Sequence, residues 1–160
     1  MLFTLLGEYV GVNRTYYGFD SFEGFPLPSE QDLITPITGQ GFWASPPEAV
    51  LKVLHDGRLN EETIQDSIRL IKGWFNDTLP SYHGQIALLH LDCDLYDSYK
   101  LALETLYDKV APGGIIMFDE YDDPRWPGAT KAIDAFFADK TEKPQAHAKC
   151  NWKYFVIKQT

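Results

Sequence analysis

Two apolar runs flanking a helical pattern dominate the middle of the chain. Residues 86–91 are almost continuously apolar, which is typical of a strand buried on both faces of a parallel sheet, and residues 115–118 repeat the pattern. Between them, apolar residues recur at helical spacing up to Val110, and the Pro-Gly-Gly sequence at 112–114 is predicted to end that helix. The order strand, helix, strand predicts a right-handed βαβ unit with parallel strands.

Acidic residues follow both of these predicted strands. Asp92 and Asp94 come directly after the first strand, and Asp119 and Glu120 after the second. The carboxyl ends of parallel strands lie at the same edge of the sheet, which is where open α/β sheets bind ligands. Four carboxylates gathered there indicate a hard divalent cation such as Mg²⁺. The alternative is a solvated acidic rim without a metal.

Further apolar patterns predict the other elements of an alternating α/β domain. Residues 2–10 predict a helix, and the β-branched and aromatic residues 15–19 predict a strand that Asp20 closes. Residues 60–72 fit a helix through the spacing of their isoleucines, or a strand at 68–72. We favour the strand because the alternation of helices and strands requires one there.

Local signals indicate two more helices and a terminal hairpin. Ser45-Pro46-Pro47-Glu48 predicts a helix start in which Ser45 caps the helix and Pro46 occupies its first position. An apolar stripe predicts another helix over about residues 127–139. The C-terminal stretch at 146–158 predicts two strands around Cys150-Asn151 that would form an antiparallel hairpin at one edge of the sheet.

Residues 21–45 form a long segment rich in proline and glycine. Loops of this length inside a compact domain are usually functional or disordered. The segment carries four large aromatic residues, Phe22, Phe25, Phe42 and Trp43. We therefore predict a substrate-covering loop over the carboxyl edge of the sheet, more mobile than the core. The alternative is a mobile insertion without a role in the site.

Length and charge limit the kind of protein this is. A chain of 160 residues predicts a single domain spanning 1–160. The net charge of −9 argues against nucleic acid and anionic membrane surfaces as partners, and no apolar run is long enough to span a membrane. The N-terminus has no basic segment, and Cys93 and Cys150 need no disulfide, so we predict a cytoplasmic protein.

Four short motifs occur in an order that resembles a known family. They are Tyr17-Gly18-Phe19-Asp20-Ser21-Phe22-Glu23-Gly24-Phe25-Pro26, Gly73-Trp74-Phe75 with Thr78-Leu79-Pro80, Asp92-Cys93-Asp94-Leu95-Tyr96-Asp97-Ser98, and Gly113-Gly114 with Phe118-Asp119-Glu120-Tyr121. Over about residues 15–140 the chain resembles the macrocin O-methyltransferase (TylF-like) family of class I S-adenosylmethionine-dependent methyltransferases. The resemblance implies an α/β Rossmann-like sheet, mostly parallel with a C-terminal antiparallel hairpin. It also implies Mg²⁺-dependent methyl transfer to a hydroxyl of a sugar or polyol on a small molecule.

The chain departs from the family pattern in three places. Cys93 stands where the family usually has glycine between two aspartates, and Asp119-Glu120 replaces a more frequent Asp-Asp pair. A first strand and a Gly-rich turn, which in the family hold the methionine end of the cofactor, are not found before Asp20. We therefore expect a truncated domain that lacks the first strand and binds S-adenosylmethionine weakly or not at all.

The resemblance and the strand-end positions assign candidate roles to individual residues. Asp20, Ser21, Gly73, Trp74, Phe75 and Asp92 are predicted to bind the cofactor, Asp92, Asp119 and Glu120 to bind Mg²⁺, and Asp94, or else Asp92, to act as the base. Asp20 would hold the ribose and Trp74 would flank the adenine, although a turn aspartate and ordinary aromatic packing are the alternatives. Tyr96, Tyr121 and Trp126 are candidates for the acceptor site, with surface or core packing as the alternative, and His90 is a candidate for a core or supporting histidine.

Two other functions remain open on the sequence. Asp92-Cys93-Asp94 after an apolar strand is also the form of the DxD metal site of glycosyltransferases, although that form explains neither the second acidic pair nor the motif from Tyr17. A non-catalytic remnant of a methyltransferase is the other alternative. The aromatic loop, together with the dimers that the resemblance to this family implies, also suggests a homodimer.

Overall fold

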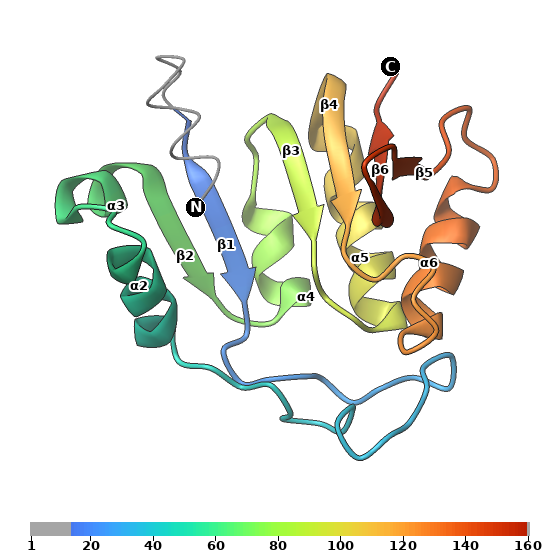
Figure 1. Ribbon diagram of the computed structural model, residues 1–160, viewed down its shortest axis with the longest axis horizontal. Coiled ribbons are helices and arrows are strands. Elements are labelled where there is room, and N and C mark those ends of the chain that lie inside the picture. The colour runs from blue at the N-terminus through green and yellow to red at the C-terminus, as the bar shows by residue number, and fades with distance from the viewer. Residues whose placement is uncertain (1–13, 160) are drawn as a thin grey trace.

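A computed structural model describes residues 14–159 of the chain (Figure 1). Its elements, in order, are β1 (Tyr16–Asp20), α2 (Pro47–Asp56), α3 (Glu61–Ser67), β2 (Ile68–Lys72), α4 (Phe75–Thr78), η1 (Leu79–Ser81), β3 (Ile86–Leu91), α5 (Tyr96–Leu106), η2 (Tyr107–Lys109), β4 (Val110–Phe118), α6 (Pro127–Phe137), β5 (Gln145–His147) and β6 (Cys150–Ile157). The helix predicted at 2–10 lies outside the described residues. None of the helices in the described part is long and apolar enough to cross a membrane.

The strands follow the predicted α/β pattern, parallel first and antiparallel at the end. Strand β1 pairs with β2, and β3 pairs with β4, both in parallel, whereas β4–β6 and β6–β5 are antiparallel. Within residues 14–159 these pairs make two ladders, β1-β2 and β3-β4-β6-β5. In Figure 1, β1 and β3 run side by side in the same direction. The Tyr82 ring joins the ladders, because it packs 5.1 Å from the Tyr17 ring and 6.1 Å from the Phe19 ring.

The predicted βαβ unit is confirmed, but its second strand begins earlier than expected. Helix α5 ends at Leu106, and Val110, predicted to be helical, is the first residue of β4. Val110 is fully buried and pairs with Ile86, as suits a β-branched residue. The Pro-Gly-Gly sequence at 112–114 therefore lies inside β4 rather than after a helix. Gly113 adopts a φ of 78°, and its N–H donates a 2.7 Å hydrogen bond to the Lys158 carbonyl beyond β6.

Of two other local predictions, the strand at 68–72 is confirmed and the helix start at Ser45 needs correction. The residues at 60–72 form both alternatives in turn, α3 and then β2, and the strand falls at Ile68–Lys72 as predicted. Helix α2 starts at Pro47, one residue later than predicted, and Pro46 is its N-cap without a side-chain hydrogen bond. Ser45 therefore does not cap this helix. The chain reverses before Cys150, which belongs to β6, and the edge hairpin is otherwise as predicted.

Helices α5 and α6 cover the β3-β4 ladder and enclose the main core. Tyr99 of α5 and Phe137 of α6 both pack against Phe118 at the end of β4, with ring centres 6.5 and 6.0 Å apart. All three side chains are essentially inaccessible to solvent. The stripe predicted for α6 is confirmed by the burial of Ala129, Ala132, Ile133 and Phe137, with Phe136 half-buried. This packing fixes the acidic end of β4 against α5.

Residues 21–45 contain no regular element and pass beneath the carboxyl ends of the strands, as predicted (Figure 1). The Asp32 carboxylate accepts a 2.8 Å hydrogen bond from the N–H of Tyr96, the first residue of α5. Phe25 packs edge-on against Trp126, 5.7 Å between ring centres. The segment thus contacts both core helices near their N-termini. Its mobility stays a prediction.

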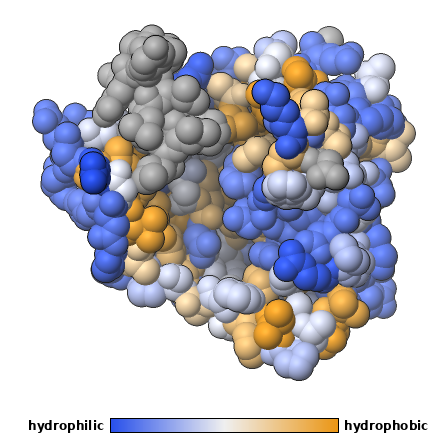
Figure 2. All heavy atoms as spheres, viewed as in Figure 1, coloured by the Kyte–Doolittle hydropathy of each residue, from blue (hydrophilic) through white to orange (hydrophobic). Residues whose placement is uncertain are grey.

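The same segment exposes apolar side chains. Leu27, Ile34 and Trp43 are each more than 60% exposed. In Figure 2, apolar groups are visible at the lower edge of the molecule, where Figure 1 places this segment, whereas hydrophilic residues cover much of the right half of the view. The loop therefore combines a buried contact with the helices and an apolar outer surface.

Candidate active site

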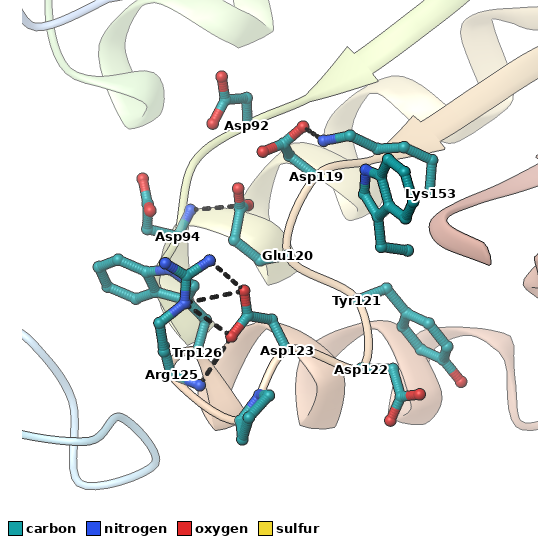
Figure 3. Close-up of a pocket in the computed structure, with 12 residues that line it drawn as sticks. Asp92, Asp94, Asp119, Glu120, Tyr121, Asp122, Asp123, Arg125, Trp126 and Lys153 are labelled. Carbon is teal, nitrogen blue, oxygen red and sulfur yellow. Dashed lines mark hydrogen bonds and ion pairs between the residues drawn. The ribbon is translucent and has the colours of Figure 1, made fainter. Parts of the chain in front are cut away.

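Three of the predicted acidic residues converge at the carboxyl ends of β3 and β4. Leu91 pairs with Phe118, so Asp92 and Asp119 each follow the last residue of neighbouring strands. One ligand atom from each of Asp92, Asp119 and Glu120 lies within 4.8 Å of the other two (Figure 3). The three side chains differ in exposure, since Asp92 is open to solvent and Glu120 is buried. Carboxylate oxygens at this spacing fit a hard cation such as Mg²⁺.

Glu120 is held from two sides. Its Oε2 lies 2.6 Å from the Tyr99 hydroxyl and accepts a long 3.3 Å hydrogen bond from the N–H of Asp94. Burial raises the pKa of Glu120 to about 8, and the charges of Asp94 and Asp92 act in the same direction, whereas the Tyr99 hydrogen bond opposes them. Without a cation, therefore, the carboxyl of Glu120 retains its proton at neutral pH.

Asp94 sits at a sharp turn between β3 and α5. Its φ of 61° places it in the left-handed region, where aspartate is one of the better tolerated residues. Burial raises the pKa of Asp94 to about 7, the Asp92 charge adds to this effect, and Arg125 opposes it. A carboxylate with a pKa near neutrality suits proton abstraction at physiological pH.

Lys153 of β6 contributes a contact that the sequence did not predict. Its ammonium forms an ion pair with Oδ1 of Asp119 (Figure 3). Phe118 pairs with Tyr154, so the antiparallel register brings Lys153 opposite Asp119. The alternation of residues in a terminal strand predicts which face each side chain takes, but not the neighbouring residue across the sheet. No sequence signal therefore singled out Lys153.

His90 also approaches Asp119, so it is a neighbour of the acidic site rather than a core residue. Its Nε2 lies 3.8 Å from Oδ1 of Asp119, beyond hydrogen-bonding distance, and its side chain is 41% exposed. Partial burial lowers the pKa of His90, with Lys153 acting in the same direction and Asp92 opposing. His90 is thus a neutral imidazole at physiological pH.

A cavity of about 510 Å³ opens beside the acidic residues. Its lining consists of Asp92, Asp94, Asp119, Glu120, Tyr121, Asp122, Asp123, Pro124, Arg125, Trp126, Trp152 and Lys153. Of the three candidates for the acceptor site, Tyr121 and Trp126 line this cavity and Tyr96 does not. Arg125 already has a partner, because its guanidinium donates hydrogen bonds to both carboxylate oxygens of Asp123. That ion pair lowers the pKa of Asp123.

A second cavity, of about 330 Å³, lies between β1 and the start of α5. It is lined by Phe19, Asp20, Ser21, Gly24, Phe25, Pro26, Trp43, Trp74, Phe75, Asn76, Asp92, Cys93, Asp94, Asp97, Ser98 and Leu101. Five of the six residues predicted to bind the cofactor are in this lining. Trp43, Asp97 and Ser98 are additional polar or aromatic residues that the prediction missed, because they come from the loop and from α5.

Gly73 is the predicted cofactor residue that does not line this cavity. It has a φ of 147°, and a Cβ there would lie 2.8 Å from the Cγ2 of Thr78. Its N–H donates to the carbonyl of Asp20, 2.9 Å away. Gly73 therefore shapes the turn after β2. Asp20 in turn accepts a 2.6 Å hydrogen bond from the N–H of Phe22, the turn role considered as its alternative.

The two cavities meet at Asp92 and Asp94, the residues that line both. One side of this junction is partly aromatic and includes Trp74 and Phe75, whereas the other is strongly acidic. A group bound on one side and a group bound on the other would therefore face each other across these two carboxylates. Such an arrangement suits transfer of a group between two bound molecules.

Relatives similar to this chain in sequence include two O-methyltransferases. A relative from Streptomyces olivaceus, 8-demethyl-8-(2,3-dimethoxy-alpha-L-rhamnosyl)-tetracenomycin-C 4'-O-methyltransferase, is 37% identical over 113 residues, 68% of this chain and 42% of its own length. Demethyldecarbamoylnovobiocin O-methyltransferase from Streptomyces niveus is 36% identical over 131 residues, 79% of this chain and 48% of its own length. The chain thus spans less than half the length of these two relatives.

Solved structures show the same fold. The calicheamicin methyltransferase CalS11 has a TM-score of 0.79 at 29% identity and matches 96% of this chain and 65% of its own. The O-methyltransferase NovP has a TM-score of 0.78 at 26% identity and matches 97% of this chain and 64% of its own. The sequence profile of the macrocin O-methyltransferase (TylF) family matches residues 1–148. The chain therefore belongs to the macrocin O-methyltransferase (TylF) family, and its fold is that of the class I methyltransferases.

Proposed function

We propose that this chain forms the methyl-transfer site of an S-adenosylmethionine- and Mg²⁺-dependent O-methyltransferase that acts on a sugar hydroxyl of a small glycosylated molecule. The observation that carries the proposal is the junction of the two cavities at Asp92 and Asp94. Family membership supports methyl transfer over the glycosyl transfer considered from the DxD motif. The names of two relatives, which specify methylation of a rhamnosyl compound and of demethyldecarbamoylnovobiocin, support the acceptor class.

The aromatic cavity is the proposed cofactor site. Asp20 at the end of β1 would accept hydrogen bonds from ribose hydroxyls through the carboxylate oxygen that does not bind Phe22. Trp74 and Phe75, which follow β2, would pack against the adenine. S-adenosylmethionine, when bound, supplies an electrophilic methyl group on a sulfonium. Asp92 and Asp94 would then lie between this group and the acceptor.

The acidic cavity is the proposed acceptor and metal site. Asp92, Asp119 and Glu120 would hold Mg²⁺ through carboxylate oxygens, and their spacing within 4.8 Å fits that ion. When bound, Mg²⁺ lowers the pKa of a sugar hydroxyl. Trp126, half-buried beneath the loop residue Phe25, would provide an apolar surface for the ring of a sugar.

Asp94 is the proposed base. The Asp94 carboxylate would take the proton of the acceptor hydroxyl, which would free that oxygen to bond to the methyl carbon that bound S-adenosylmethionine supplies, while the sulfur would keep the electron pair of its broken bond to that carbon. The products are a methyl ether, a neutral thioether and a protonated Asp94. Asp94 is suited to this role because it lines both cavities.

The test measures both cofactor binding and methyl transfer. S-adenosylhomocysteine binding is measured by isothermal titration, and transfer of labelled methyl groups to rhamnosides is measured with and without Mg²⁺. Asp94→Asn should reduce turnover by about a hundredfold or more and leave S-adenosylhomocysteine affinity within a few-fold. Asp139→Asn, an 84% exposed residue remote from the cavities, is the control.

Each part of the proposal can be rejected by a separate result. Absence of S-adenosylhomocysteine binding would agree with the weak cofactor binding expected from the sequence, and it would reject the cofactor site in this chain and favour a non-catalytic remnant. Binding without transfer to any glycoside would reject the acceptor class. Equal turnover with and without Mg²⁺ would reject the metal. The cytoplasmic location and the homodimer also remain proposals, which cell fractionation and light scattering would test.

A further inference from the structure

Lys153 is the basic residue that the structure places directly on a proposed metal ligand. Its ammonium is paired with Oδ1 of Asp119, and both side chains are about one third exposed. Asp119 is one of the three carboxylates whose ligand atoms lie within 4.8 Å of one another. A positive charge therefore already occupies the edge of a site built to receive a cation.

The position of Lys153 is fixed by the pairing of strands β4 and β6. Phe118 of β4 pairs with Tyr154 of β6, and the strands are antiparallel. Asp119 and Lys153 therefore lie directly across from each other at the end of this strand pair. The N–H of Asp119 is also fixed, because it donates a 3.0 Å hydrogen bond to the Leu91 carbonyl of β3. Both partners of the ion pair are thus anchored by ordered strands.

The other basic groups near the site do not take this role. Arg125 lines the same cavity, but its guanidinium donates hydrogen bonds to the carboxylate of Asp123. His90 lies 3.8 Å from Asp119, beyond hydrogen-bonding distance, whereas Lys153 contacts Asp119 directly. Among the described residues lining this cavity, Lys153 is therefore the cation that balances the ligand carboxylates.

We propose that Lys153 is a built-in counter-cation of Asp119 that competes with the divalent cation. This inference rests on the proposed Mg²⁺ site. Without a divalent ion, the ammonium reduces the repulsion between the carboxylates of Asp92 and Asp119 and occupies one oxygen of Asp119. A divalent cation at the same carboxylates is repelled by the ammonium and gains only the oxygens that the ammonium leaves free.

Competition of this kind sets the metal affinity and couples it to the acceptor cavity. Lys153 lines that cavity together with Trp152. An ammonium released from Asp119 by the divalent ion would remain at the cavity wall, available to the oxygen atoms of an acceptor. The expected consequence is that the natural residue weakens metal binding relative to an uncharged side chain of similar length.

The experiment measures divalent-cation binding rather than turnover. Mn²⁺ binding is followed by electron paramagnetic resonance, and Mg²⁺ binding by calorimetry, for the natural chain, Lys153→Met and Lys153→Arg. Lys153→Met should tighten binding by about tenfold or more, and Lys153→Arg, which keeps the charge, should change it less than threefold. Lys131→Met is the matched control, since Lys131 contacts Gln31 of the loop instead.

Unchanged or weaker binding by Lys153→Met would overturn the proposal, and weaker binding would make Lys153 a residue that positions Asp119. Asp119→Asn separates this result from failure of the metal site itself. If the natural chain binds Mn²⁺ and Asp119→Asn does not, the site stands whatever Lys153 does. If no variant binds Mn²⁺, both the metal site and the counter-cation are rejected. Should Lys153→Met fail to fold by circular dichroism, Lys153→Gln provides the same test.

Discussion

The Tyr99 hydroxyl lies 2.6 Å from Oε2 of Glu120 and 2.9 Å from the carbonyl oxygen of Leu91. A tyrosine hydroxyl has a single proton, so it cannot donate to both oxygens at once. A carbonyl only accepts, which means that a protonated Glu120 donating to Tyr99 would allow all three groups to be satisfied. When Glu120 is ionised, Tyr99 would donate to it, and the Leu91 carbonyl would keep the N–H of Asp119 as its donor.

This relationship predicts that Tyr99→Phe destabilises the protein. The substitution leaves the buried carboxyl of Glu120 without its main side-chain partner, which should cost about 1–3 kcal/mol in the free energy of unfolding. Urea denaturation measures the change. Tyr154→Phe is the control, because its hydroxyl binds Asp122 at an exposed position, and it should cost clearly less. Equal losses in the free energy of unfolding would mean that the buried contact with Glu120 stabilises the protein no more than the exposed contact with Asp122 does.

Trp74→Ala should weaken S-adenosylhomocysteine binding by about tenfold, since stacking of a base on an aromatic ring contributes about 1–3 kcal/mol. Trp74 lines the aromatic cavity, whereas Trp152 lines only the acidic one. Trp152→Ala should therefore leave this affinity almost unchanged in the same calorimetric titration. A larger loss of S-adenosylhomocysteine affinity with Trp152→Ala than with Trp74→Ala would show that the cofactor binds in the acidic cavity instead.

Gly128→Ala should destabilise the protein although alanine is the better helix former. A Cβ at Gly128 would lie 1.9 Å from Oδ1 of Asp32, the oxygen that binds the N–H of Tyr96. Crowding of this kind typically costs about 1–3 kcal/mol. The double variant with Asp32→Ala removes the obstacle, so its cost should be smaller than the sum of the single costs by about 1 kcal/mol. Additive costs in urea denaturation would show that the loop does not press on α6.

The contact between Tyr107 and Glu142 predicts a pH-dependent stability. The Tyr107 hydroxyl donates to the Glu142 carboxylate, and this hydrogen bond holds the pKa of Glu142 below its ordinary value of 4.5. A depressed pKa means that the folded state favours the ionised form, so the stabilisation is present above pH 4.5 and is lost as the pH falls through the lowered value.

Tyr107→Phe should accordingly lower the free energy of unfolding by about 0.5–1.5 kcal/mol at pH 7, and the difference from the natural chain should shrink towards pH 3. Thermal denaturation between pH 7 and pH 3 provides the comparison. Tyr154→Phe again serves as a control with an exposed carboxylate partner. A difference that grows as the pH falls would contradict the sign derived for Glu142.

Much of the fold was readable from the chain because buried strands and amphipathic helices leave direct periodic patterns. The strand β3 has the bounds indicated by its apolar run, and the hairpin of β5 and β6 was predicted from the C-terminal stretch at 146–158. Position in the chain also explains why Asp92, Asp119 and Glu120 meet, because acids that end neighbouring parallel strands must share an edge. Boundaries were less certain, as Val110 shows, because a β-branched residue fits the end of a helix pattern as well as the start of a strand.

Only the tertiary structure decided which groups from distant parts of the chain touch one another. The pairing of Lys153 with Asp119 depends on the register between β4 and β6, and a shift of one residue would turn the lysine to the other face. The contact of Tyr99 with Glu120 depends on how α5 packs on the sheet, and the two cavities meet at Asp92 and Asp94 because the loop and the helices surround them. Local sequence determines periodicity and strand ends, whereas charge pairing and cavity shape arise from packing between elements, which no local pattern encodes.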